Sequence, residues 1–65
     1  MKCGDRAGAA QSYWNLGLTY EDLSDLAQAE ENIALAVQIA EQIGLPNLEE
    51  WQDGLKQVRA KRHGA

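Results

Sequence analysis

The side chains that could perform chemistry in this sequence are few and far apart. Cys3 lies near the first residue and His63 near the last, and each is the only residue of its type among 65. A cysteine nucleophile needs a base within hydrogen-bonding reach, and no spacing in this sequence brings such a pair together. A single cysteine can neither close a disulfide within the chain nor assemble a metal site. We therefore predict that the protein is not an enzyme, and we expect no catalytic residue and no cofactor.

The densest group of possible metal ligands consists of Glu21, Asp22 and Asp25. Their spacing differs from that of a calcium-binding loop, which alternates its ligands, contains a glycine and ends on a distant glutamate. The three residues fall where one predicted helix ends and the next begins. Solvation and helix capping therefore explain them, and we expect no metal site.

Charge is unevenly distributed along the chain, whose formal net charge is −4. No basic residue occurs between Arg6 and Lys56, whereas acidic residues recur throughout that stretch. This balance argues against nucleic-acid binding. No apolar run approaches the roughly 20 residues that span a bilayer, and the N-terminus lacks the apolar core of a signal peptide. We predict a soluble, cytoplasmic protein that binds neither nucleic acid nor membrane.

Apolar residues recur at helical spacing and nowhere alternate as in a strand, which predicts an all-α fold. A first helix is expected from about residue 6 to 22, with Asp5 as its N-cap. A second helix is expected from about residue 26 to 43, and Asp25 and Gln28 form a capping box at its start. The short connection predicts an antiparallel helix hairpin. The apolar stripe of the first helix comprises residues 9, 13, 16, 20 and 23.

A third helix is expected from about residue 48 to 62. Gly44 is a typical C-terminal cap of the preceding helix, Pro46 prevents that helix from continuing, and Asn47 can cap the new one. The third helix has one apolar side and polar remaining sides, so we expect it to cover the hairpin on one face. Its basic end matches the helix dipole, and we expect it to pair with an acidic neighbour. Its apolar stripe comprises Leu48, Trp51, Leu55 and Val58.

Gly17 stands in the middle of the first helix, where glycine costs about 1 kcal/mol of helix propensity relative to alanine. A glycine on a packed helix face allows a second backbone to come close. Ala29, a small residue early in the second helix, is its natural counterpart. We therefore predict that the first two helices cross closely at Gly17.

The residues around Gly17 also carry a family resemblance. The pattern of an aromatic residue, leucine-glycine, tyrosine and then spaced small and large residues is similar to that of the tetratricopeptide repeat (TPR). The resemblance covers about residues 5–46, and the end of the second helix looks like the longer variety of this repeat. Two departures are Ser24, where the family usually has a glycine, and the third helix, which resembles a capping helix rather than a second repeat. The matching residues are Tyr13, Leu16, Gly17, Tyr20, Ala29, Ile33 and Ala36.

The resemblance implies an α-solenoid fragment, with one hairpin and a cap, that serves as a non-catalytic scaffold for protein–protein interaction. In such repeats the first helix lines a groove that holds a peptide. Asn15 stands where some longer-repeat relatives use an asparagine to hold the backbone of a bound peptide. The lysine-asparagine clamp for a terminal carboxylate is absent, so an acidic C-terminal tail is not the expected ligand. The candidate partner-binding residues are Gln11, Trp14, Asn15, Leu18, Glu21 and Asp22.

A single repeat lacks the neighbours that normally complete its core, since about three repeats are usually needed for stability. The third helix can cover one side of the hairpin, and nothing in the sequence covers the other. We therefore expect a homo-oligomer, with a closed dimer through the Trp14–Leu18 surfaces of two chains as the favoured form. Head-to-tail stacking, an exchange of helices between copies, and a fragment whose neighbours were removed are the open alternatives.

Trp14 and Leu18 thus have two competing explanations. In the first, the first helix binds an extended or helical peptide of another protein. In the second, the chain is a self-assembling structural or engineered repeat unit without a peptide ligand, and its own copies cover these residues. Exposed aromatic clusters are rare on monomers, which favours self-association or core packing for this pair. Asn15 has a simpler explanation as well, since an exposed polar residue is usually just solvated.

Overall fold

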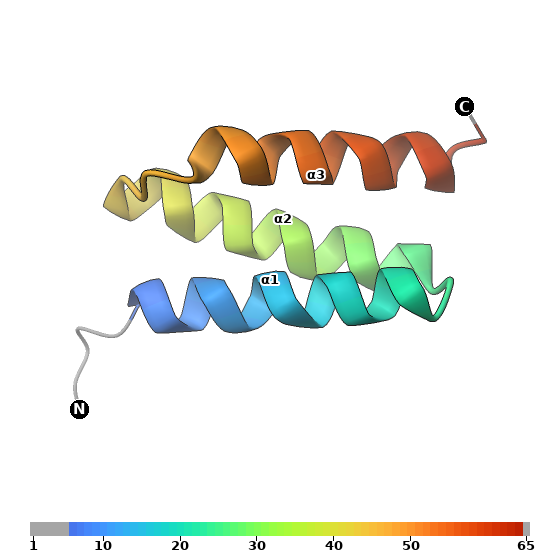
Figure 1. Ribbon diagram of the computed structural model, residues 1–65, viewed down its shortest axis with the longest axis horizontal. Coiled ribbons are helices and arrows are strands. Elements are labelled where there is room, and N and C mark those ends of the chain that lie inside the picture. The colour runs from blue at the N-terminus through green and yellow to red at the C-terminus, as the bar shows by residue number, and fades with distance from the viewer. Residues whose placement is uncertain (1–5, 65) are drawn as a thin grey trace.

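The protein is described by a computed structural model that covers residues 6–64. Three helices make up this part of the chain, α1 (Arg6–Asp22), α2 (Leu26–Ile43) and α3 (Leu48–Arg62), and it contains no strand. The helices lie side by side, with α2 between α1 and α3 (Figure 1). The predicted all-α fold, an antiparallel hairpin followed by a third helix, is thereby confirmed. The predicted cap Asp5 lies outside the described residues.

The ends of α2 follow the local signals of the sequence. The Oδ1 atom of Asp25 accepts a hydrogen bond from the Gln28 amide over 3.3 Å. At the other end, Gly44 adopts a left-handed conformation with φ 72° and ψ 45°, and its amide donates to the Ala40 carbonyl. A side chain is strained in this conformation, which explains why a glycine stands there. The glycine cap is confirmed, and the predicted capping box is confirmed only in its Asp25 half, because the Asp25 amide donates to the Tyr20 carbonyl and not to the Gln28 side chain.

The predicted side-chain cap of α3 is wrong. Asn47 occupies the position before the helix, but its side chain makes no capping hydrogen bond. Its φ of −96° and ψ of 23° depart from the extended backbone that an N-cap residue usually adopts. Only its backbone takes part, because the Asn47 carbonyl accepts from the Trp51 amide at 3.1 Å.

The hydrophobic core forms where α2 faces both of its neighbours. Val37 and Ala40 of α2 are buried, as are Trp51 and Val58 of α3. Each fully buried large aliphatic side chain stabilises the fold by about 1.5–3 kcal/mol. The many alanines on α2 allow the neighbouring helices to approach closely. The remaining buried residues are Ala10, Gly17, Ala29, Ile33, Ala36 and Leu55.

The apolar stripe predicted for the first helix is not the buried line of α1. The buried residues of α1 are Ala10 and Gly17, whereas Leu16 is 46% exposed and Leu23 is 69% exposed. The prediction that this stripe faces the core is confirmed for Tyr13 and Tyr20, which are half-buried and pack against the core, and is wrong for Leu16 and Leu23. Both α2 and α3 approach α1 from the same side, which moves the buried line toward Trp14 and leaves the far half of the stripe uncovered.

The close crossing at Gly17 is present. A Cβ atom added at Gly17 would overlap Cγ1 of Ile33 and would lie 3.2 Å from the Ala29 carbonyl oxygen. The backbones of α1 and α2 therefore approach as predicted. The nearest atoms belong to the Ile33 side chain, however, and the predicted counterpart Ala29 contributes its backbone oxygen.

Candidate interaction surfaces

The candidate sites of this protein are helix faces. The described residues enclose no pocket, and they contain no group of three or more metal-ligating His, Cys, Asp or Glu side chains. His63 directly follows α3 and is exposed, and Cys3 lies outside the described residues. Within residues 6–64, no helix is both long enough and apolar enough to cross a membrane.

Trp14 leans from α1 onto α3. Its ring stacks on that of Trp51, with the ring centroids 4.9 Å apart and the planes 4° from parallel. Gly54 leaves the room for this contact, since a Cβ atom added there would lie 2.6 Å from Cη2 of Trp14. Trp51 is 2% exposed, and Trp14 is half-buried. A stacked aromatic pair contributes about 0.5–1.5 kcal/mol beyond the burial of its area.

The role of Gly54 was missed in the sequence, although a signal for it exists. The pattern Trp-x-x-Gly-Leu occurs at residues 14–18 and again at residues 51–55. The third helix thus shares this short pattern with the first, although we did not expect it to repeat the TPR-like motif. A glycine in a helix interior costs about 1 kcal/mol, so a second one in α3 indicates a second close approach.

Ion pairs hold the basic end of α3 to both other helices. Lys61 Nζ lies 2.6 Å from Glu21 Oε2 on α1. On α2, the two carboxylate oxygens of Glu30 accept from Arg59 at 3.0 Å and from Arg62 at 2.8 Å. The hydrogen bonds from Arg62 and then Arg59 hold the pKa of Glu30 below its ordinary value. The prediction that this end pairs with acidic neighbours is confirmed.

Four of the six predicted partner-binding residues are exposed on α1. Gln11, Asn15 and Asp22 are polar, and the amide of Gln11 donates to Asn15 Oδ1 at 3.3 Å. Leu18 is 39% exposed. These side chains are free to meet a partner, and helical spacing places them on one side of α1.

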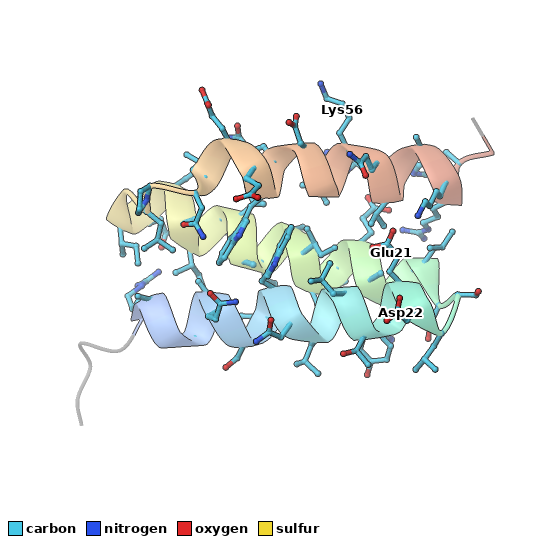
Figure 2. The ribbon with its side chains drawn as sticks, in the orientation of Figure 1. Glu21, Asp22 and Lys56 are labelled. Atoms are coloured by element: carbon cyan, nitrogen blue, oxygen red, sulfur yellow. The ribbon has the colours of Figure 1, made fainter. Side chains whose placement is uncertain are left out.

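The other two predicted residues, Trp14 and Glu21, are already engaged by α3. Trp14 stacks on Trp51, and Glu21 pairs with Lys61. Figure 2 shows Glu21 between α1 and α3. Both residues are half-buried, so part of each side chain is occupied by α3 and is not accessible to a partner.

A different surface lies on the side of the hairpin away from α3. On α1, Leu16 and Trp14 lie on opposite sides of Gly17, about 100° and about 60° around the helix. Since Trp14 stacks on Trp51 of α3, Leu16 faces away from α3. On α2, Leu35 is 38% and Ile43 is 39% exposed. We call this surface the uncharged face, and it comprises Tyr13, Leu16, Tyr20, Leu23, Leu35, Ile39 and Ile43.

The two helices contribute to the uncharged face along their whole length, because they run antiparallel in a fixed register. Gly17 meets Ile33 near the middle, and Arg6 Nη2 donates to Gln42 Oε1 at one end. None of these seven residues is charged, and the charged residues at the border of the face are Glu31, one helical turn before Leu35 on α2, and Arg6, at one end of α1. The polar neighbours of the face are occupied internally, since Thr19 donates to the Asn15 carbonyl at 3.0 Å.

Comparisons of the chain with family models, with curated proteins and with solved structures gave no match. The resemblance to the TPR family therefore stays a prediction from the spacing of residues in the first two helices.

Proposed function

We propose that this chain is a non-catalytic protein-interaction module of a TPR-like kind, and that it works by covering its uncharged face with another polypeptide. One observation carries the proposal. Leu16, Leu23, Leu35 and Ile43 are between 38% and 69% exposed on one side of the hairpin. Monomeric soluble proteins rarely expose large contiguous apolar patches, and those that exist often mark interaction sites.

A second candidate function is peptide binding between α1 and α3. It is favoured by the exposed Leu18 and by the polar pair Gln11 and Asn15 beside it. It is the weaker candidate because Trp14 and Glu21, which the sequence offered to a peptide, contact α3 instead.

The two surfaces can be separated with a photoreactive side chain on the full chain. Leu16 and Leu18 are two residues apart on α1, similarly exposed at 46% and 39%, and directed to different sides. We would replace each in turn with p-benzoylphenylalanine, irradiate the protein both purified and in cell extract, and analyse the products by mass spectrometry.

The proposed function expects crosslinks to polypeptide from position 16 and few from position 18. Crosslinks from position 18 alone would instead support peptide binding on the side of α1 that carries Leu18. A lack of crosslinks from position 16, in the purified protein and in the extract alike, would refute the proposed use of the uncharged face.

A further inference from the structure

We propose that the polypeptide on the uncharged face is a second copy of this chain, which makes the protein a homodimer joined hairpin to hairpin about a two-fold axis. This inference rests on the proposed function and names its partner. It also moves the interface expected from the sequence. Trp14 is engaged by Trp51, so the pairing surface lies on the opposite side of α1 from the Trp14–Leu18 surface.

The distribution of charge favours a copy of the same chain as the partner. The described part of the hairpin has Arg6 as its single cation, whereas acidic residues occupy its other sides and its turn. Two copies that met through those sides would bring carboxylate against carboxylate. The seven side chains of the uncharged face carry no charge, so two copies that meet there bury no unpaired charge, and Glu31 stays at the border of the contact. The acidic residues concerned are Glu21, Asp22, Asp25, Glu30, Glu31 and Glu41.

The polar side chains beside the uncharged face are compatible with an apolar partner surface. The Thr19 hydroxyl donates to the Asn15 carbonyl, and the Asn32 amide donates to the Gln28 carbonyl at 2.9 Å. These groups already have hydrogen-bond partners within the chain, so an apolar partner surface leaves none of them unpaired. Tyr13 and Tyr20 add aromatic surface with a polar tip, which is a common component of interfaces. In a two-fold interface the same patch serves both copies.

The size of the face is sufficient for a specific dimer, with little excess. Helices of 17 and 18 residues are about 25 Å long, and two adjacent helices are about 20 Å wide. The face therefore offers about 500 Å² per copy and about 1,000 Å² per dimer, which is the lower limit for a specific interface. We expect a reversible dimer with a dissociation constant in the micromolar range.

The test is sedimentation of the full chain from low to high micromolar concentration, with Leu16→Glu as the disrupting variant and Leu18→Glu as its matched control. We expect the parent and Leu18→Glu to form dimers, and Leu16→Glu to associate at least about tenfold more weakly. Leu23→Glu, at the most exposed of these leucines, should act like Leu16→Glu with even less risk to the monomer fold. Circular dichroism would verify that each variant remains helical.

Salt provides an independent readout. Because the face contains no charge, the association constant should change little between low and high sodium chloride, whereas pairing through acidic sides would strengthen as salt screens repulsion. A monomeric parent at high micromolar concentration, a dimeric Leu16→Glu or a monomeric Leu18→Glu would each overturn the inference.

The photocrosslinks keep this inference separate from the proposed function. Crosslinks from position 16 to the chain itself support both. If position 16 crosslinks only to other proteins and the parent is monomeric, the proposed function still holds, but the homodimer is refuted. The absence of any crosslink from position 16 would refute the proposed function itself.

Discussion

Trp14 of α1 and Trp51 of α3 lie face to face, with their ring planes 4° from parallel and their centroids 4.9 Å apart. They connect the two helices that flank α2 (Figure 1). Together with the Lys61–Glu21 ion pair, the stack sets the position of α3 against α1 as well as against α2. The contact requires a residue without a side chain at position 54, and this requirement can be tested.

Gly54→Ala should destabilise the protein by about 1 kcal/mol, although alanine is the better helix former. The new methyl group would displace Trp14, whose Cη2 lies 2.6 Å from the added Cβ position, and would disturb a stack that contributes about 0.5–1.5 kcal/mol. In a Trp14→Leu background the obstacle is gone, so Gly54→Ala should stabilise by about 1 kcal/mol. Urea unfolding of the four proteins gives the coupling energy. Equal stabilisation in both backgrounds would contradict the stack.

Gly17→Ala should cost about 2–3 kcal/mol, and Gly17→Leu should prevent folding. The methyl group would overlap Ile33 and press against the Ala29 carbonyl oxygen at 3.2 Å, which belongs to a backbone and cannot rotate away. Thermal unfolding followed by circular dichroism measures the loss. Asn15→Ala, at an exposed position of the same helix, is the control and should have little effect.

The two turns differ in how well their residues suit a left-handed backbone. Ser24 has a φ of 65° and Gly44 a φ of 72°. Ser24→Gly should stabilise the protein by about 0.5 kcal/mol, because relief of strain exceeds the entropy gained by the unfolded chain. Gly44→Ala should destabilise it by about 1 kcal/mol through strain alone, since no atom lies within 4 Å of the added Cβ. Opposite signs in urea unfolding are expected, and equal signs would contradict the backbone assignment.

Glu30 should make stability depend on pH in the acidic range. Its pKa in the folded protein lies below its ordinary value, because Arg62 and Arg59 hydrogen-bond to the carboxylate. A lowered pKa contributes stability above the pKa of the unfolded state, and this contribution is lost as the pH falls through the folded-state pKa. Glu30→Gln should therefore lower Tm at pH 7, and the difference from the parent should disappear on acidification. A difference that persists below that pKa would assign the effect to packing.

The helix ends could be predicted from the sequence because their signals are local. Asp25 and Gln28 are three residues apart, and Gly44 acts through its own backbone angles. Asn47 is the exception, because its φ and ψ turn its side chain from the amides that it would cap.

The exposed side of α1 could not be predicted, because it depends on a helix far along the chain. Spacing shows that Leu16 and Leu23 share a stripe, but not that α3 approaches from the other side. In the sequence of α1 alone, Trp14 resembles a partner-binding residue. Its actual partners, Trp51 and Gly54, lie on α3. The second Trp-x-x-Gly-Leu pattern is the sequence feature that links them.

The outer side of α3 carries Glu49, Asp53 and Lys56, all of them exposed, and Figure 2 shows Lys56 directed away from the hairpin. Water solvates this side well, so a further molecule gains little by docking there. If the uncharged face is the surface through which two copies pair, as we propose, each molecule can bind one partner. Assembly would then end at the pair, and raising the concentration would yield more pairs rather than longer filaments.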